Sequence, residues 1–322
     1  MSHPRKTFGL QGAEAAQEAF ETALSRGRLH HAWLLTGPEG VGKATFAYRA
    51  ARRLLGARDQ DSEQDPVARL VIARSHPDLM VLDLEAPDGK PRRNIPVDEA
   101  RLLPEFFSKA PAMAPFRVAI IDTADDLNVN AANAVLKTLE EPPERGVLFL
   151  ISNSPGKLLP TVRSRCRRLA FAPWSEDDIA AFLVGRDAAN DHDAALLAGM
   201  AHGGPGRALS LAGQGAIEMD RTAHEILRAL PDRDEGMMLA LAEGFRGGEG
   251  AMRFNLLFER LADQVHAMSR RSAMAGETAG LDRWAAAWEQ LIRAPREAEG
   301  INLDRADVFW TTLDQLRQAA RA

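Results

Sequence analysis

The chain has 322 residues, of which 45% are hydrophobic and 26% are charged, a balance typical of a globular protein with a substantial core. This length suits two or three domains. The chain has 40 Lys and Arg residues and 45 Asp and Glu residues. The resulting net charge of −5 excludes a polyanion-binding signature for the chain as a whole. Any contact with DNA must therefore be local or be made by a partner.

The sequence contains no membrane or secretion signal. No segment reaches the roughly 20 consecutive apolar residues of a membrane span, and the first residues lead into a polar, Ala- and Glu-rich helix instead of an apolar signal core. The single cysteine, Cys166, excludes internal disulfides and a cysteine-rich zinc site. We therefore expect a cytoplasmic protein with no membrane partner and no bound metal.

The first half of the chain alternates short apolar runs with helical patterns, which predicts an α/β fold with a parallel sheet covered by helices. The expected strands are Trp33–Thr36, Leu79–Leu84, Arg117–Asp122, Val147–Ser152 and Arg168–Phe171. The expected helices between them are Ala44–Leu55, Val97–Lys109 and Val129–Glu140. Pro104 should kink or split the second of these helices, and Gly56–Pro66 should form a surface loop.

Only helical patterns follow Phe171. Ser175 is expected to cap a helix, with Asp178 three residues later, and Gly203–Gly206 interrupts this helical unit. From residue 213, apolar residues recur at spacings of three and four, as in the core of a helical bundle. They are Phe254, Leu257, Phe258, Leu261, Val265 and Met268, then Leu281, Trp284, Trp288 and Leu291. We expect an α/β domain over residues 1–172, a small helical domain over 173–212 and an all-α domain over 213–322.

A glycine-rich loop, GPEGVGKA, occupies positions 37–44, after the first expected strand and at the start of a helix. A phosphate-binding P-loop requires this context, because the glycines let backbone N–H groups face the phosphates and the helix N-terminus adds a favourable dipole. The lysine of such a loop reaches the β- and γ-phosphates. The candidate nucleotide-binding residues here are Gly37, Gly40, Gly42 and Lys43.

Two side chains that ATP hydrolysis needs are missing from this site. The residue after the lysine should be Ser or Thr, whose hydroxyl binds Mg²⁺, but it is Ala44, and Thr45 lies about 100° further round the helix. Asp122 ends a strand as a Walker B aspartate does, yet Thr123 stands where a glutamate usually orients the attacking water. Asp122 could equally cap the turn that follows it. We expect ATP or ADP binding that is weak or absent, and negligible hydrolysis.

A basic run, TVRSRCRR, covers positions 161–168. By its charge alone it could be a solvated turn or a patch that contacts the DNA backbone. Its Ser164-Arg165-Cys166 motif, together with the P-loop, Asp122 and the run ANAVLKTLEEPP at positions 132–143, resembles the bacterial clamp-loader AAA+ family of DNA polymerase III. The resemblance covers about residues 8–211. Its degenerate P-loop with a retained Ser-Arg-Cys is similar to the delta-prime subunits of that family.

The resemblance implies that Arg165 is an arginine finger, which acts in trans on ATP held by a neighbouring subunit. A guanidinium suits this role because it is planar, always charged and able to stabilise charge on a transferring phosphoryl group. The implied protein is a non-hydrolysing stator with an AAA+ RecA-like domain, a helical lid and a collar-forming C-terminal domain. Its implied partners are the motor (gamma/tau) and delta subunits of a hetero-pentamer and, through it, the sliding clamp and primed DNA. It would have no active site of its own within the DNA-directed DNA polymerase holoenzyme.

Other family positions are matched less specifically. Arg207, after Gly206, matches a nucleotide-sensing arginine, although an arginine exposed at a helix start is equally ordinary. Asn153 matches a polar sensor position but could simply form a turn. Many relatives carry a cysteine-ligated zinc module after the P-loop helix, whereas positions 55–78 contain no cysteine, so we expect no zinc.

Two other functions stay open. The chain could be an ATP-hydrolysing motor subunit of the same family, with water or Thr45 replacing the lost hydroxyl. It could also be a stand-alone P-loop phosphotransferase, which the long helical C-terminal part and the Ser-Arg-Cys motif argue against. An ATPase assay on the isolated chain separates the first of these from a stator.

Overall fold

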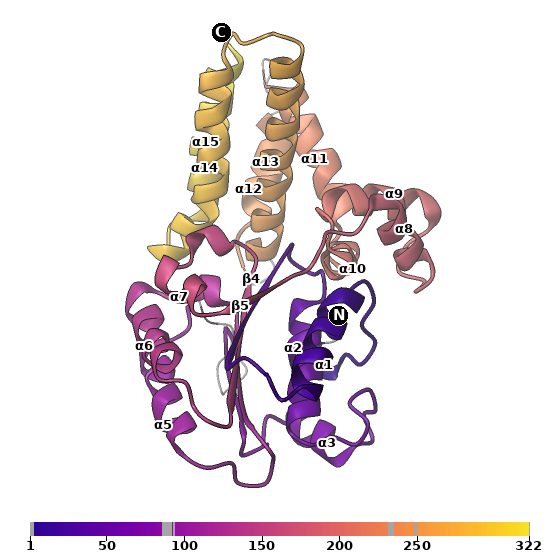
Figure 1. Ribbon diagram of the computed structural model, residues 1–322. Coiled ribbons are helices and arrows are strands. Elements are labelled where there is room, and N and C mark those ends of the chain that lie inside the picture. The colour runs from indigo at the N-terminus through magenta and orange to yellow at the C-terminus, as the bar shows by residue number, and fades with distance from the viewer. Residues whose placement is uncertain (1–2, 86–91, 93, 231–234, 248–249, 322) are drawn as a thin grey trace. The chain divides into compact units, whose positions relative to one another are not determined.

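The computed structural model describes residues 3–85, 92, 94–230, 235–247 and 250–321, and its ribbon is drawn in Figure 1. The chain forms two compact units, Met1–Ser210 and Leu211–Ala322, which are described separately below. The three-domain division expected from the sequence stays a prediction. No helix among the described residues combines the length and the apolar character needed to cross a membrane.

The first unit is built on a parallel sheet with the strand order β2-β3-β4-β1-β5. Every strand lies within one residue of its predicted bounds, so the predicted α/β class is confirmed. Because all the strands are parallel, their carboxyl ends meet at one edge of the sheet. The strands are β1 (Ala32–Thr36), β2 (Leu79–Asp83), β3 (Arg117–Asp122), β4 (Gly146–Ser152) and β5 (Arg167–Ala170).

Helices cover both faces of this sheet (Figure 1). Side chains alternate along β1, so that Trp33 and Leu35 pack under one layer while Leu34 packs under the other. The β1, β3 and β4 strands are almost fully buried because both faces are covered, which explains their continuous apolar sequences. One layer contains α1 (Glu14–Ser25), α2 (Lys43–Leu54) and α3 (Pro66–Ile72), and the other contains α4 (Val97–Ala100), α5 (Leu102–Ser108), α6 (Val129–Glu140) and α7 (Pro160–Ser164).

Two details of the helices bear on the sequence predictions. The expected helix Val97–Lys109 is split between α4 and α5 at Arg101, which confirms the expected effect of Pro104. Helix α3 follows the expected loop and was not predicted. Asp65 caps it by accepting hydrogen bonds from the N–H groups of Val67, at 2.8 Å, and Ala68, at 3.4 Å.

Three helices follow β5: α8 (Glu176–Val184), α9 (Asp191–Met200) and α10 (Pro205–Gly213). Ser175 caps α8 as predicted, since its hydroxyl accepts a hydrogen bond from the N–H of Asp178 at 3.1 Å. The predicted interruption at Gly203–Gly206 is also confirmed, because α10 begins at Pro205.

The second unit is helical throughout its described residues. Its core contains an aromatic cluster in which Phe245 contacts Phe254 and Phe309, with ring centroids 5.3 and 5.2 Å apart. The predicted apolar face of the longest helix is confirmed, but Trp288, predicted in the bundle core, is 37% exposed. The helices are α11 (Ala216–Arg228), α12 (Glu235–Gly244), α13 (Gly250–Met274), α14 (Leu281–Gly300) and α15 (Arg305–Ala320).

Candidate functional site

The P-loop connects the carboxyl end of β1 to α2. Gly42 is the N-cap of α2, and Lys43 is the first residue of that helix. Asp122 ends β3 at the same edge of the sheet and is the register partner of Asp83 at the end of β2. The parallel topology therefore brings the predicted loop and the predicted Walker B carboxylate to one edge, as the sequence led us to expect.

Lys43 is occupied by its own loop. Its side chain is almost fully buried, and its Nζ donates hydrogen bonds to the carbonyl oxygen of Gly37, at 2.8 Å, and to that of Pro38. Burial lowers the pKa of Lys43 to about 8, while the carboxylates of Asp122 and Glu39 act in the opposite direction. A P-loop lysine that is to bind phosphate must first give up these carbonyl contacts.

Asp122 is a poor ligand for Mg²⁺ in this setting. Its pKa is raised to about 6, mainly by burial and then by the neighbouring Asp83 carboxylate, against the lowering effect of Lys43. Ala44 packs against the apolar core and has no oxygen to complete a metal site. The residues present therefore do not fit the Mg²⁺ site that a P-loop ATPase requires.

The two acidic residues near Thr123 in the turn after β3 already have hydrogen-bond partners. The hydroxyl of Thr123 donates to Asp126 at 2.7 Å. Asp125 accepts hydrogen bonds from the Ser152 hydroxyl at 2.7 Å and from the N–H groups of Asn153 and Ser154 at 2.6 and 3.1 Å. Asp125 thus fixes the end of β4. Asn153 contributes its backbone N–H to these contacts, and the side chain of Asn153 is exposed.

The start of α10 lies directly on the P-loop. The N–H of Gly206 donates to the carbonyl oxygen of Gly40 at 2.8 Å. A side chain at Gly204 would overlap with the Glu39 carbonyl oxygen, and one at Gly40 would overlap with the backbone nitrogen of Arg207. This close approach, which we call the α10–P-loop contact, is possible because both positions are glycine.

Arg207 joins the same contact through its side chain. Its Nη1 lies 3.5 Å from Oε2 of Glu39, a carboxylate that is largely exposed. The structure thus places Arg207 beside the P-loop, in contact with a carboxylate of that loop.

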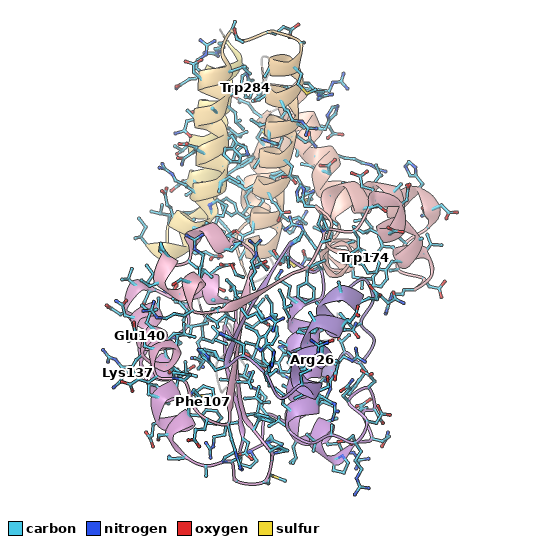
Figure 2. The ribbon with its side chains drawn as sticks, in the orientation of Figure 1. Arg26, Phe107, Lys137, Glu140, Trp174 and Trp284 are labelled. Carbon is cyan, nitrogen blue, oxygen red and sulfur yellow. The ribbon has the colours of Figure 1, made fainter. Side chains whose placement is uncertain are left out.

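Trp174 links the connection after β5 to the N-terminal segment. Its indole packs against Gly12, where a side chain would overlap with the indole ring. The backbone N–H of Trp174 donates to the Gly203 carbonyl oxygen at 3.0 Å. Trp174 is labelled in Figure 2 between the sheet and the α8–α9 helices. A cavity of about 780 Å³ opens beside it and is lined by Gln11, Asp178, Phe182 and Arg186 among others, with no P-loop residue in its wall.

Arg165 lies elsewhere, at the end of α7. Its Nη2 is 3.0 Å from Oε1 of Glu140, and its Nη1 donates to the Thr161 carbonyl oxygen at 3.1 Å. The side chain is 37% exposed. Within the described part of the chain its guanidinium contacts α6 and α7 and no P-loop residue.

Two other arginines of the basic run, Arg167 and Arg168, have partners of different kinds. The guanidinium of Arg167 lies over the Trp33 ring at 4.9 Å from its centroid. Arg168 donates from Nε to the Thr36 hydroxyl at 3.0 Å. Cys166 is half-buried against the α6–α7 side of the core, and burial raises its pKa to about 12, so it is a packing residue and not a reactive thiol.

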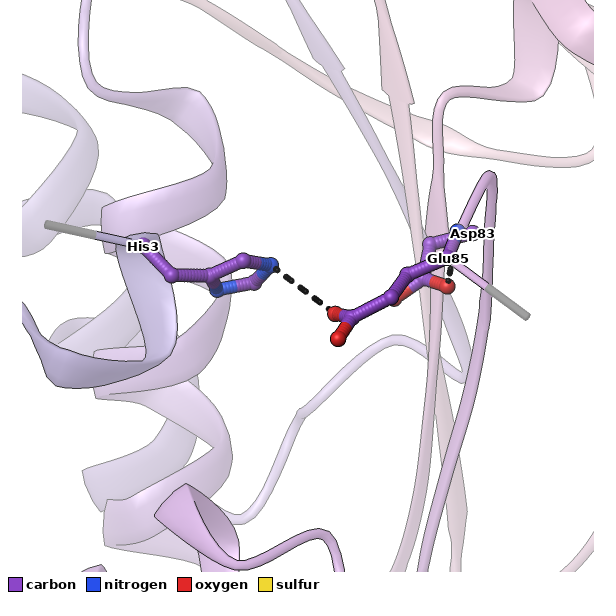
Figure 3. Close-up of side chains that lie close together, drawn as sticks. All are labelled: His3, Asp83 and Glu85. Atoms are coloured by element: carbon purple, nitrogen blue, oxygen red, sulfur yellow. Dashed lines mark hydrogen bonds and ion pairs between the residues drawn. The ribbon is translucent and has the colours of Figure 1, made fainter. Parts of the chain in front are cut away.

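A separate polar cluster lies at the end of β2 (Figure 3). His3, Asp83 and Glu85 each offer a ligand atom within 4.8 Å of the others. Two guanidinium groups already balance the carboxylates, because Arg5 lies 2.7 Å from Glu85, and Arg74 lies 3.1 Å from Asp83 and 3.2 Å from Glu85. Burial lowers the pKa of His3, with the Arg5 charge acting in the same direction. These ion pairs tie the N-terminal segment to the end of β2.

The sequence analysis named the P-loop residues, Asp122, Arg165 and Arg207 as candidates, which they remain, and it missed their partners. Glu140 was part of a recognised run, yet nothing in the run indicated its ion pair with Arg165. Asp125 was noticed only as a poor substitute for the missing base. In the sequence, Gly204 was interpreted as part of a helix interruption. Its position close to Gly206-Arg207 is the signal that could have identified it as a residue of the site.

Part of the chain matches a known protein family, and several known proteins are similar to it. The family described as DNA polymerase III, delta subunit matches residues 12–175. DNA polymerase III subunit delta′ of Pseudomonas aeruginosa is 40% identical over 154 residues, 47% of this chain and 46% of that protein. The delta′ subunit of Escherichia coli is 35% identical over 198 residues, covering 60% and 58%. DNA polymerase III subunit gamma of Buchnera aphidicola subsp. Acyrthosiphon pisum is 33% identical over 180 residues, covering 56% and 49%. The chain spans about half the length of the curated relatives it matches.

Proposed function

The chain belongs to the DNA polymerase III delta-subunit family, and from this we propose that it is a non-hydrolysing clamp-loader subunit that supplies Arg165 to ATP held by a neighbouring subunit. Its partners would be motor subunits of the gamma/tau kind and a delta subunit in a hetero-pentameric ring. The assembled ring would act on a sliding clamp and primed DNA. The chain itself would have no active site within the polymerase holoenzyme.

The contrast between the surroundings of Lys43 and those of Arg165 supports this proposal most directly. Lys43 is buried and bonded to the carbonyl oxygens of its own loop, whereas Arg165 is partly exposed and contacts no residue of that loop within the described chain. A cation that is kept at the surface, away from a degenerate phosphate site, suits a phosphate presented by another molecule.

Weak or absent nucleotide binding is the second part of the proposal. Ala44 and Thr123 remove the Mg²⁺ hydroxyl and the catalytic base, and the α10–P-loop contact adds a backbone hydrogen bond at the loop's apex. A nucleotide would have to displace Lys43 from its carbonyl partners. We propose that the P-loop site of this chain does not turn over ATP and serves in the assembly as a fixed surface.

The test is an ATPase assay on the complex reconstituted with its motor and delta subunits. Arginine fingers contribute roughly 10³–10⁵ in rate at the site they serve, or about 4–7 kcal/mol of activation free energy. Arg165→Ala should therefore silence the site it serves while leaving assembly intact, as measured by size-exclusion chromatography. Arg163→Ala is the matched control, because Arg163 is exposed on the same helix. If Arg165→Ala leaves the DNA-stimulated rate unchanged, the arginine-finger role is wrong.

A motor subunit is the second candidate, and the 33% identity to a gamma subunit favours it. A motor would hydrolyse ATP in its own P-loop. The purified chain alone, assayed with Mg²⁺ and ATP, separates the two: we expect no turnover above a Lys43→Met control. Turnover that depends on Lys43 would favour the motor.

A further inference from the structure

Arg165 is held within its own chain by a carboxylate. The Nη2–Oε1 distance to Glu140 is 3.0 Å, and the second guanidinium nitrogen, Nη1, donates to the Thr161 carbonyl oxygen at 3.1 Å. These two contacts come from different helices, α6 and α7, and they engage two of the donor nitrogens of the guanidinium. The resting position of Arg165 is therefore defined by specific partners.

The helices that carry this pair are fixed against each other. Leu139 of α6 and Val162 of α7 are both almost fully buried and belong to the same apolar cluster. The residues that follow each of them in the chain, including Glu140 and Arg165, therefore emerge from a rigid base. Glu140 and Lys137 are labelled in Figure 2 on the side of α6 that faces away from the sheet.

Glu140 is an unfavourable residue for its own helix. It is the last residue of α6, where unpaired carbonyl groups concentrate partial negative charge. A carboxylate at this end is disfavoured unless a cation compensates it, and Arg165 provides that cation. When Arg165 moves away from Glu140, the carboxylate remains next to the partial negative charge at the end of α6. This repulsion favours the return of the guanidinium.

We propose that Glu140 is a positioning residue that parks Arg165 in the resting subunit and that the phosphate of the neighbouring subunit's ATP must displace it. This inference rests on the proposed function, because it assumes that Arg165 acts in trans. Glu140 then competes with the phosphate for the same guanidinium. The competition suppresses engagement until the partner subunit presents its anion closely and in the right orientation.

An incidental surface pair is the alternative, since exposed ion pairs contribute little to stability. The two readings differ in what removal of the carboxylate does to the assembled complex. An incidental pair leaves the ATPase rates unchanged. A parking pair restrains Arg165 mainly in the resting complex, so its loss raises the unstimulated rate and leaves the fully stimulated rate in place.

The experiment compares Glu140→Gln with Glu141→Gln in the reconstituted complex, with and without saturating clamp and primed DNA. Glu141 is the matched control: it is the next residue, carries the same charge, is exposed, and has no ion pair with any residue that the structure describes. We expect Glu140→Gln to raise the unstimulated ATPase rate about two- to five-fold, equivalent to about 0.4–1 kcal/mol. The stimulated rate should stay within about twofold of the parent, and Glu141→Gln should change neither.

Adding Arg165→Ala to Glu140→Gln should abolish the increase, because a purely structural effect of position 140 would survive loss of the finger. An unstimulated rate that does not rise in Glu140→Gln, or that rises equally in Glu141→Gln, would overturn the parking role. A separate result, unchanged rates for Arg165→Ala alone, would overturn the proposed function itself. Circular dichroism and size-exclusion chromatography of each variant confirm folding and assembly before the rates are compared.

Discussion

The P-loop region and the α6–α7 surface both carry a cation suited to phosphate, but the protein treats the two cations differently. Lys43 is buried, has a lowered pKa and donates to carbonyl oxygens of its own loop. Arg165 is partly exposed and held by one carboxylate and one carbonyl oxygen. The first cation is part of the fold, whereas the second is held at the surface by partners that an anion could replace.

The surroundings of the two regions differ in the same way. The start of α10 contacts the P-loop through backbone atoms: Gly204 and Gly206 lie on the α10 side and Gly40 lies in the loop. The shape of the loop therefore depends on main-chain packing. On the α6–α7 surface, which we define by Glu140 and Arg165, the buried Leu139 and Val162 form a packed base, and the ion pair itself is partly exposed. The P-loop is therefore held by main-chain contacts, whatever its side chains bind.

A large effect is predicted for how tightly the base of the α6–α7 surface is packed. Burial raises the pKa of Cys166 to about 12, so the thiolate population at pH 8 should be about 10³-fold lower than in an unfolded chain. Labelling by a thiol reagent such as dithionitrobenzoate should slow by about this factor in the native protein relative to the chain in urea. Equal rates would mean that the residue after Arg165 is accessible.

A glycine pair tests the α10–P-loop contact. Gly40 and Gly27 both have left-handed backbone angles, with φ of 74° and 62°, but a side chain at Gly40 would meet α10 whereas none would be met at Gly27. Gly27→Ala should cost about 1–2 kcal/mol of unfolding free energy from backbone strain alone. Gly40→Ala should cost about 1–3 kcal/mol more, from overlap with packed atoms.

Urea unfolding of the two variants measures the difference between them. If Gly40→Ala is no worse than Gly27→Ala, α10 does not press on the loop, and the P-loop is freer to accept a ligand than we infer.

The pH dependence of stability tests the charge state of the P-loop region. The pKa of Asp122 is about 6 in the folded protein, above its unfolded value of about 3.9, so the folded state binds the proton more tightly between these values. The unfolding free energy should therefore fall as pH rises from 4 to 6, by about 2 kcal/mol from this group.

Asp122→Asn should remove that contribution. The unfolding free energy of the variant minus that of the parent protein should therefore increase as pH rises from 4 to 6.5. Urea unfolding at each pH measures both values. A constant difference between the two proteins across this range would show that Asp122 is not held in a buried, carboxylate-rich setting.

How much of this contrast could be predicted from the sequence depended on the range of the interactions. The strands and the P-loop were found because apolar runs and a local glycine pattern determine them. The cap at Ser175 and the break near Pro104 are equally local and were correct. Trp288 was placed in the core because helical spacing identifies a face but does not say how much of that face is covered.

The site's partners could not be predicted because they join segments distant in sequence. Glu140 meets Arg165 only because α6 and α7 pack side by side. Gly204 meets Glu39 only because α10 folds back onto the P-loop. A polar residue such as Asp125 gave no sign that it would bind the end of β4 through two backbone N–H groups and a hydroxyl.

The most direct test of the account compares Lys43→Met with Arg165→Ala in the same reconstituted complex. Both substitutions remove one cation, and Met keeps the buried volume at position 43. DNA-stimulated ATPase activity should stay within about twofold of the parent for Lys43→Met, whereas the site served by Arg165 should lose about 10³-fold or more in Arg165→Ala. The opposite pattern, in which activity depends on Lys43 and not on Arg165, would contradict the account.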